Sequence, residues 1–474
     1  MTTRRSFLKL TALAGTGTYL TRKLDLWPRV FGQVPGGTLS PTDIPKFAMP
    51  LFIPPAMPLA GRDNATDYYT IAVRQFEQQI LPPRHPRTTI FGYGALTDAR
   101  SFSCPSCTIE ARAQRPARVK WVNQLMDADG AYLPHLLPVD QTLHWANPPA
   151  GLAGRDMNGT DPSPYRGPVP WITHVHGGHT PDESDGYPEA WYLPAASNIP
   201  AGFARSGTWY NHFQAKFKAR WSGDWEPGSA TSVYPNNQRA TTLWYHDHTL
   251  GMTRVNMYAG AAGCYLIRGG ATDLPPGALP GPAPGVGDPA GTSCYEIPII
   301  IQDRSFNADG SLFYPDNRAF FEGLHLGQLQ IPFIPQAGCT GPSDVSPIWN
   351  PEFFGNTMMV NGRTWPYLNV EQRRYRFRFV NGCNSRFLIL KLGRDGLPFW
   401  QIGADGGSTS EFQIPNSNRP PWCDCSNARS HQNRSGFGLH RTRRSRLSWN
   451  RARSPTARPP ARTEPAVRHR NGRG

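Results

Sequence analysis

Short segments of alternating apolar and polar residues predict that this chain is built from β-strands. Residues 116–123 (PARVKWVN) alternate as the residues of a half-buried strand do. In residues 374–379 (RYRFRF), the aromatic rings are predicted to face inward and the arginines outward. The dipeptide Asn361-Gly362 lies between apolar residues and predicts a two-residue hairpin turn. Further strands are predicted at residues 171–176, 243–248, 258–267 and 295–301.

Proline and glycine, with 49 and 47 residues, punctuate these segments and favour an all-β fold with many turns. The Pro/Gly-rich stretch at residues 269–292 predicts a linker between two sandwich-type units. We therefore expect one β-sandwich domain at residues 40–268 and a second at residues 293–412. Residues 195–232 are polar and aromatic without a clear period, and we interpret them as a surface insertion in the first domain.

The first residues have the pattern of a twin-arginine export signal. Arg4 and Arg5 precede Ser-Phe-Leu-Lys, and a mildly apolar stretch follows from Leu10 to Leu20. We expect residues 1–28 to act as this signal, with export by the twin-arginine machinery to the periplasm or the extracellular space. The alternative is a chance basic start before a short helix. No apolar stretch of the sequence is long enough for a membrane span.

The formal net charge of +15 is concentrated late in the sequence. Residues 419–474 contain 14 arginines and no lysine, against Asp424 and Glu464, and so carry +12 of that charge. The rest of the chain is close to neutral and gives no indication of a nucleic-acid groove.

Residues 413–474 show no apolar period, and two interpretations are open. One is a disordered Arg-rich tail that binds nucleic acid or anionic surfaces. The other is an aberrant segment, the out-of-frame translation of a GC-rich gene. We favour the second, because an exported protein has little use for a nucleic-acid tail.

Eight cysteines are compatible with an oxidising compartment. Cys104 and Cys107 have the spacing of a metal or redox pair, but no second such pair with zinc spacing accompanies them. We interpret them as an ordinary loop pair that is suited to a disulfide. The dispersed cysteines expected to be buried thiols are Cys264, Cys294, Cys339 and Cys383.

Two histidine pairs are the most informative feature of the sequence. His174-Val-His176 ends one predicted strand, and His246-Asp-His248 ends another. Residues i and i+2 of a strand face the same way, so each pair points to one side and four imidazoles can converge. Neutral imidazole suits copper, zinc, iron or nickel, and the spacing does not decide between one ion and a cluster.

The alternative for these histidines is a structural role with bonds to backbone groups. Two pairs, each at the end of an aromatic strand, favour the metal site over that role. Asp247 points to the opposite face of its strand, and we expect it to accept hydrogen bonds rather than to bind metal. The isolated histidines are expected to be ordinary core or surface residues: His85, His135, His144, His179, His212 and His325.

The segments around the histidine pairs resemble the multicopper oxidase family, most closely its branch of bacterial spore-coat laccases and bilirubin oxidases. THVHGGHTPDESDGYPEAW (residues 173–191) and LWYHDHTLGMTRVNMYAGAAGCYLIR (residues 243–268) are similar to that family's first two copper motifs. The resemblance extends from residue 40 to residue 407 apart from the insertion. It continues through residues 302–315, 358–371, 375–386 and 401–407.

This resemblance implies tandem cupredoxin-like domains and copper as the cofactor. In the family, a type 1 copper takes single electrons from phenols, aromatic amines or bilirubin-like pigments, and a cluster of type 2 and type 3 coppers reduces dioxygen to water. By resemblance, His174 binds the type 2 copper, and His176, His246 and His248 bind the type 3 pair. Asp185 matches an acidic residue that assists proton delivery to oxygen, with an ordinary turn aspartate as the alternative.

The sequence also departs from the family pattern. The family's third domain carries a His-Pro-x-His-x-His motif and a His-Cys-His-x-x-x-His motif with an axial Met, and neither occurs here. A type 1 site needs a thiolate and two imidazoles, so we expect none, and the cluster keeps four of the family's eight histidines. We expect the second domain to be truncated near Phe412 and the chain to be inactive as written.

The resulting hypothesis is a laccase-like or bilirubin-oxidase-like enzyme whose partners are a small aromatic reductant and dioxygen, with no nucleic acid. Two hypotheses come from other classes of protein. One is a copper-free cupredoxin-type envelope protein with a binding or structural role, and retention of all four histidines speaks against it. The other is a nucleic-acid binder that acts through the Arg-rich tail.

Overall fold

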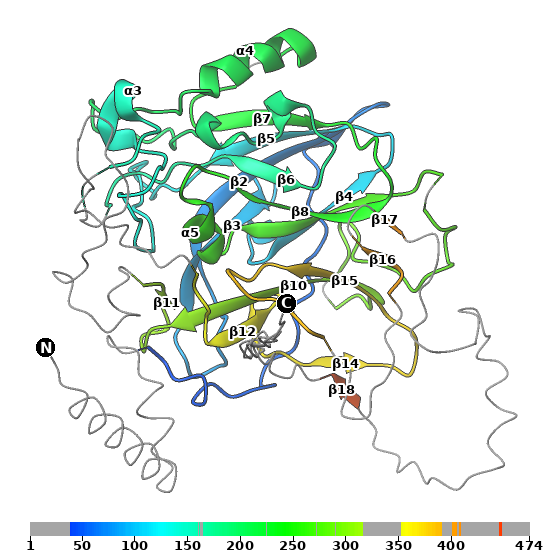
Figure 1. Ribbon diagram of the computed structural model, residues 1–474. Helices are drawn as coiled ribbons and strands as arrows, with labels where there is room; N and C mark the ends of the chain where they lie inside the picture. Colours follow the sequence, from blue (N-terminus) through cyan, green and yellow to red (C-terminus); the bar gives the residue numbers. More distant parts are fainter. Residues whose placement is uncertain are drawn as a thin grey trace, which may run out of the picture.

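The computed structural model describes residues 38–159, 161, 165–223, 225–271, 273–289, 291–315, 352–390, 401–404, 407–408 and 445–447. The expected signal at residues 1–28 lies outside the described residues. The expected tail at residues 413–474 also lies outside them, except for one three-residue strand. Most described elements are β-strands, which confirms the all-β prediction (Figure 1). Among the described helices, none combines the length and the apolar character needed to cross a membrane.

The first unit consists of strands β1–β9 in two packed sheets (Figure 1). One sheet has the order β1-β2-β5-β7, with β3 also paired to β2, and the other has the order β4-β9-β8-β6. The strands are β1 (Gly61–Arg62), β2 (Asp67–Gln78), β3 (Thr88–Ala95), β4 (Ser106–Arg112), β5 (Ala117–Asn123), β6 (Thr173–His176), β7 (Ser229–Tyr234), β8 (Thr241–Asp247) and β9 (Ala262–Arg268). The helices are η1 (Ala99–Ser101), η2 (Pro148–Ala150), α3 (Gly151–Gly154), η3 (Asp182–Ser184), η4 (Pro188–Ala190), α4 (Tyr210–Trp221) and α5 (Thr253–Tyr258).

The second unit contains a smaller sheet and follows residues 269–292. The described part of residues 269–292 contains no helix or strand. The order of the smaller sheet is β11-β10-β12-β13, and β15 pairs in parallel with β10. The strands of this sheet are β10 (Glu296–Phe306), β11 (Leu312–Phe313), β12 (Thr357–Val360), β13 (Arg363–Thr364) and β15 (Arg376–Asn381). The strands outside this sheet are β14 (Leu368–Val370), β16 (Gly403–Ala404), β17 (Gly407–Ser408) and β18 (Ser445–Leu447), and β16 pairs with β17. Strand β18 pairs with β14. The domain boundaries stay a prediction.

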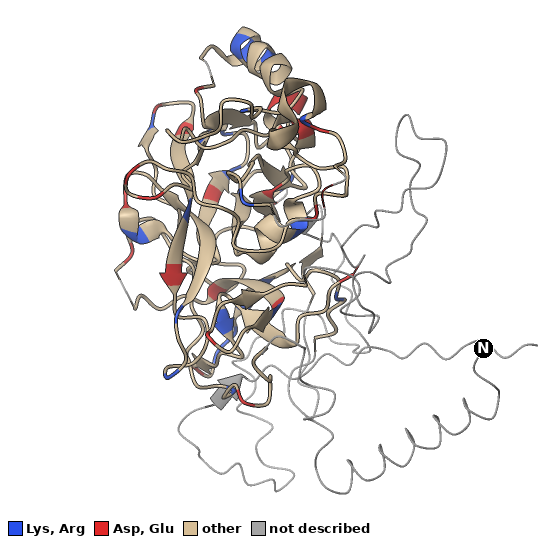
Figure 2. Ribbon diagram, turned by 90° about the vertical axis from the view of Figure 1, so that its left-hand side faces the viewer, with Lys and Arg blue, Asp and Glu red and all other residues tan. Residues whose placement is uncertain are grey.

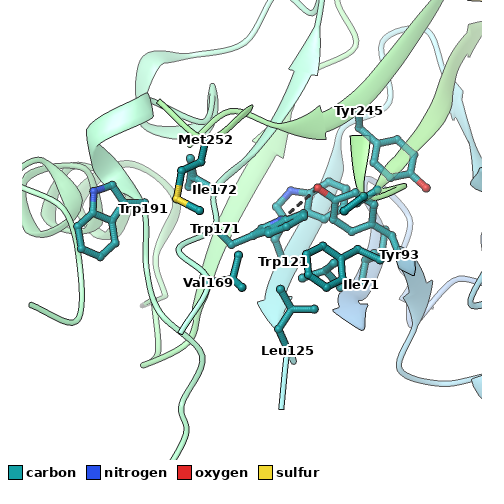
Figure 3. Packing of buried hydrophobic residues seen from close by; sticks show 14 of the residues in the cluster. Ile71, Tyr93, Trp121, Leu125, Val169, Trp171, Ile172, Trp191, Tyr245 and Met252 are labelled. Atoms are coloured by element: carbon teal, nitrogen blue, oxygen red, sulfur yellow. Dashed lines mark hydrogen bonds between the residues drawn. The ribbon is translucent and has the colours of Figure 1, made fainter. Parts of the chain in front are cut away.

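Aromatic rings fill the space between the two sheets of the first unit (Figure 3). Trp121, Trp171, Tyr93 and Tyr245 are at most 1% exposed. The ring of Tyr93 lies edge-on to the other three, with centroid separations of 5.5, 5.8 and 5.2 Å in that order. The indole Nε1 of Trp171 donates to the hydroxyl of Tyr93 at 3.1 Å. Burying a large apolar side chain stabilises a fold by about 1.5–3 kcal/mol, so this cluster holds β8 firmly from its core side.

Residues 195–232 are integrated into the first unit, although a surface insertion is predicted there. They contain α4 and the start of β7. Tyr210, Phe213 and Phe217 of α4 are buried against the core. Strand β7 is buried along its whole length and pairs with β5. The prediction is wrong for β7 because a strand buried on both faces carries no polar and apolar alternation.

Charged residues of both signs are spread over the two units (Figure 2). On α4, which carries several of the lysines and arginines, two of them make ion pairs with η3. Lys216 Nζ lies 2.5 Å from a carboxylate oxygen of Asp182. Arg220 Nη1 lies 3.4 Å from a carboxylate oxygen of the buried Glu183. These pairs tie the helix to the segment that follows β6.

The arginine face of β15 contacts the first unit, whereas the alternation predicts that it faces solvent. Arg378 is bonded to Glu296 of β10 and donates to the Thr242 hydroxyl of β8 at 2.7 Å. Arg268 Nη1 and Arg376 Nη1 lie 2.8 and 3.7 Å from the same Glu296 carboxylate. Burial favours a raised pKa for Glu296, but Arg378 and Arg268 hold it below its ordinary value. The prediction is wrong because the alternation of polar and apolar residues shows only that the two faces of a strand differ. It does not show whether solvent or another part of the protein covers the polar face.

The turn between β12 and β13 is the hairpin that Asn361-Gly362 predicts. Both residues have positive φ, 44° and 68°, as a two-residue hairpin turn of this type requires. The turn lies against the first unit, because a Cβ placed on Gly362 would be 1.8 Å from the carbonyl oxygen of Cys104. The buried side chain of Asn361 donates to the carbonyl oxygens of Phe52 and Pro298, each at 2.9 Å.

Cys104 and Cys107 are free, buried thiols, so the disulfide interpretation is wrong. Each sulfur faces a separate backbone carbonyl, that of Gly260 at 3.3 Å for Cys104 and that of Ser101 at 3.2 Å for Cys107. Burial raises the pKa of the two thiols to about 11 and about 12. Cys107 also lies in β4 rather than in a loop. Among the cysteines expected to be buried thiols, Cys264 and Cys294 are buried, Cys383 is half-buried, and Cys339 lies outside the described residues.

Candidate metal centre

Strands β6 and β8 bring the four predicted histidines onto one face. The strands pair antiparallel, with His174 opposite His246 and His176 opposite Trp244. His248 follows β8 directly and continues the same alternation. The residues between the histidines face the aromatic core, since alternate residues of a strand point to opposite sides. The two predicted histidine pairs therefore lie side by side, one pair from each strand.

The ring nitrogens are close enough to share a metal. The ligand atoms of His174, His176 and His246 all lie within 4.8 Å of one another. His246 Nε2 and His176 Nδ1 are 3.3 Å apart. Two nitrogens each about 2.0 Å from one ion at a tetrahedral angle have about this separation. The ring of His248 completes the group, with its centroid 4.8 Å from that of His174.

Backbone carbonyls determine which nitrogen carries the proton in two of the rings. His174 Nδ1 donates to the carbonyl oxygen of Asp185 at 2.5 Å, and His246 Nδ1 donates to that of Asp247 at 2.7 Å. A carbonyl oxygen only accepts, so Nδ1 is protonated and Nε2 keeps its lone pair in both neutral rings. His248 differs, because its Nδ1 is buried without a hydrogen-bond partner among the described residues.

Burial lowers the pKa of two histidines of the cluster. Burial, with a smaller contribution from the neighbouring histidines, lowers the pKa of His246 to about 3. The pKa of His248 is lowered by burial and by the nearby His174. Burial also disfavours the charged form of His174, but its hydrogen bonds and charge interaction with Asp185 outweigh that and raise its pKa. Metal binds the unprotonated ring, so His246 and His248 are ready ligands at neutral pH.

Asp185 lies at the edge of the cluster. One carboxylate oxygen is 3.4 Å from His174 Nδ1, and the side chain is 47% exposed. The next residue, Gly186, has a φ of +78°, and a Cβ there would lie 2.4 Å from the carbonyl oxygen of Thr173. Only glycine lets the backbone pass this close to β6, and that approach keeps Asp185 beside His174.

The chain is similar in sequence to laccases and multicopper oxidases. It is 33% identical over 365 residues to a laccase of Bacillus subtilis, which covers 76% of this chain and 54% of that protein. It is 32% identical over 418 residues to a laccase of Haloferax volcanii, covering 87% of this chain and 54% of that one. It is 35% identical over 322 residues to multicopper oxidase LPR1 homolog 1 of Oryza sativa, covering 68% and 41%. The chain belongs to the multicopper oxidase family.

This multicopper oxidase chain spans about half the length of the curated relatives it matches. No family model matches it. The crystal structure of a multi-copper oxidase from Pediococcus acidilactici is 19% identical and covers 77% of this chain and 51% of that one, with a TM-score of 0.44. Family membership and the observed sheets together confirm the predicted class of tandem cupredoxin-like units.

The histidine face of this multicopper oxidase fits copper. Its donors are imidazole nitrogens, which suit copper among the first-row metals. The unpartnered Nδ1 of His248 is a buried polar atom of the kind that a bound ion satisfies. The assignment of single histidines to type 2 or type 3 copper stays a prediction.

The sequence reasoning missed two residues that lie beside the cluster, Trp244 and Asn256. The ring of Trp244 lies 4.3 Å from that of His246 and 5.5 Å from that of His176. Its position two residues before His246 places it on the same face, so the strand period could have identified it. Asn256 of α5 donates to the carboxylate of Asp247 at 2.8 Å, and no local spacing predicts this contact. Asp247 is fully buried and accepts hydrogen bonds, as predicted.

Proposed function

We propose that this multicopper oxidase chain binds copper through His174, His176, His246 and His248, as part of a cluster at which dioxygen is reduced to water. The observation that carries the proposal is the convergence of four imidazoles on one face, with a buried unpartnered nitrogen among them. Copper held there supplies single-electron chemistry between a reducing substrate and dioxygen. The match to the family motifs supports His174 as the type 2 ligand and the other three histidines as type 3 ligands.

We assign the handling of protons at this site to Asp185. Its carboxylate is half exposed and lies beside His174, so it can exchange protons with water and hold one next to the cluster. The carbonyl of the same residue orients the His174 ring. Asp185 would therefore have two separate roles, one through its backbone and one through its side chain.

The family supports the proposed substrate class. The relatives from Bacillus subtilis and Haloferax volcanii bear the name laccase, which supports a small phenolic or aromatic-amine reductant. The 474-residue sequence contains no type 1 copper motif, and we infer that this polypeptide alone does not oxidise such substrates.

The Arg4-Arg5 start supports export by the twin-arginine route to the periplasm or the extracellular space.

Copper binding and oxidase activity test the proposal separately. The purified 474-residue protein is loaded with Cu(II), dialysed, and analysed for bound copper by mass spectrometry and electron paramagnetic resonance. We expect retained copper with nitrogen ligands, and no oxidation of an o-diphenol. His246→Ala should remove most of the copper, whereas His212→Ala, which changes an exposed histidine on α4, should not.

Three results would count against the proposal. Absence of retained copper in a folded protein would favour the copper-free cupredoxin-type binding protein. Clear turnover of the diphenol would show that the sequence holds a complete set of redox sites. Salt-sensitive DNA binding that is lost on removal of residues 413–474 would instead support the nucleic-acid hypothesis.

A further inference from the structure

The carboxylate of Asp247 accepts four hydrogen bonds and joins three segments: the residue before β6, the end of β8 and α5. Its Oδ1 accepts from the Ile172 N–H at 3.3 Å, just before β6, and from the Thr249 hydroxyl at 2.6 Å, just after β8. Its Oδ2 accepts from the Thr249 N–H at 3.1 Å and from Asn256 Nδ2 at 2.8 Å. The carboxylate therefore joins the start of one histidine strand to the end of the other.

Asn256 extends this connection to a histidine that the sequence marks as isolated. Its Oδ1 lies 2.9 Å from His135 Nε2, and both side chains are at least 95% buried. Since the Nδ2 group of Asn256 donates to Asp247, its Oδ1 must accept, so His135 carries its proton on Nε2. His135 Nδ1 then accepts from the Leu137 N–H at 2.9 Å.

All donors in this chain of residues point toward Asp247. His135 donates to Asn256, and Asn256 donates to Asp247. The backbone carbonyl of Asp247 in turn accepts from His246 Nδ1. The side chain of Asp247 thus holds the residue whose carbonyl orients the ring of His246, and the peptide group of that carbonyl leads directly to His248.

We propose that Asp247, Asn256 and His135 form a positioning chain that orients His246 and His248 for copper from the core side of β8. This inference rests on the proposed function, because it concerns copper at the same face. None of the three residues is placed to bind copper. Groups that orient metal-binding residues typically change metal affinity by about 10- to 100-fold when they are removed.

Variants of His135 and Asp247 test the chain. In Asp247→Asn, one carboxylate oxygen becomes an amide nitrogen that faces two buried donors, so the end of β8 must shift. We expect the dissociation constant for Cu(II), measured by competition with a chelator, to rise by about 10- to 100-fold. His135→Phe removes the donor to Asn256 and should give a smaller rise. His135→Gln can donate to Asn256 from Nε2 and should restore the affinity.

A matched control separates positioning from stability. Asp156 is a second buried carboxylate of the first unit, and its partners, Trp191 and Thr208, lie outside both histidine strands. Asp156→Asn should lower the melting temperature and leave the affinity of the folded protein for Cu(II) unchanged. The paramagnetic resonance spectrum of bound Cu(II) should change in Asp247→Asn and His135→Phe and stay the same in Asp156→Asn and His135→Gln.

The outcomes distinguish failure of the positioning chain from failure of the proposed function. If the unaltered protein binds no Cu(II), the proposed function itself fails. If it binds Cu(II) and both Asp247→Asn and His135→Phe match it within twofold with the same spectrum, the positioning chain is overturned and the proposed function stands. If Asp247→Asn does not fold, the pair His135→Phe and His135→Gln decides, and equal affinities in that pair overturn the inference.

Discussion

Strands β6 and β8 carry the same His-x-His spacing but are supported from opposite sides. On β8, His246 is 4% exposed, and the chain from Asp247 through Asn256 to His135 supports it from the core. On β6, His176 is exposed, and His174 is held from the solvent side by Asp185. The spacing sets which face the rings share, whereas the surroundings set how firmly each ring is held.

The difference also separates the two strands electrostatically. The pKa of His246 is lowered to about 3, mainly by burial, while that of His174 is raised by its bonds to Asp185. As the pH falls, protons therefore compete with copper for the ring of His174 on β6 at a higher pH than for the ring of His246 on β8. The histidines of β8 are held unprotonated and oriented in advance of metal binding. On β6, protonation of the site depends on the pH of the solvent.

The largest expected effect comes from removing one ring from each strand. Loss of a group that orients a metal ligand weakens metal binding by up to about 100-fold. His246→Ala should weaken Cu(II) binding by more than this, because it removes a buried ligand that is already oriented. His176→Ala should cost less, since water can replace an exposed ligand. Chelator competition on the two purified variants measures the difference. Equal losses, or a larger loss for His176→Ala, would contradict the distinction between the strands.

An intermediate effect is expected at the support of β6. Gly186→Ala places a Cβ against the Thr173 carbonyl at a positive φ, and should lower the free energy of unfolding by about 1–3 kcal/mol. The backbone around residue 186 must move to relieve this contact. The movement should take Asp185 away from His174 and lower the pKa of the His174 ring. Urea unfolding and nuclear magnetic resonance titration measure the two quantities.

Gly202→Ala is the matched control for that variant. No atom lies within 4 Å of a Cβ placed there, and the residue has no positive φ. It should leave both the stability and the pKa of His174 unchanged. If Gly186→Ala behaves in the same way, the loop that follows β6 does not hold the ring.

The smallest expected effect is a shift in the pH dependence of copper binding. Asp185→Asn removes the charge beside His174 but keeps the backbone bond, so the pKa of His174 should fall. Protons then compete less, and the pH at which half of the copper is lost should move down, by less than about one unit because Asp185 is half exposed. Copper retention measured from pH 8 to pH 4 shows the shift. An upward shift, or none, would exclude Asp185 as the cause of the raised pKa.

The histidine face could be predicted from sequence because its information is local. Alternation in β6 and β8 places His174 and His176, and likewise His246 and His248, on one side, and the aromatic residues before them mark buried strands. The register that sets His174 opposite His246 adds the one fact that the sequence does not contain, namely that the two pairs meet.

The rest of the site depends on contacts between distant residues. His135 and Asn256 are 121 positions apart and meet only because α5 packs beside the loop that holds His135. The buried strand β7 has no alternation to reveal it. The arginines of β15 face the first unit, and the sequence does not show where that unit lies relative to β15. Such features follow from tertiary packing, which local patterns do not report.

The Asn361–Gly362 turn bears on how this chain could have evolved. Its glycine lies against the carbonyl of Cys104 and its asparagine bonds the carbonyl of Phe52, so residues of both units are fitted to one another at this point. The units are therefore not freely exchangeable modules. A recombination event within residues 269–292 that joined the halves of two diverged relatives would separate the turn from its matching surface, so lineages should inherit the two units together.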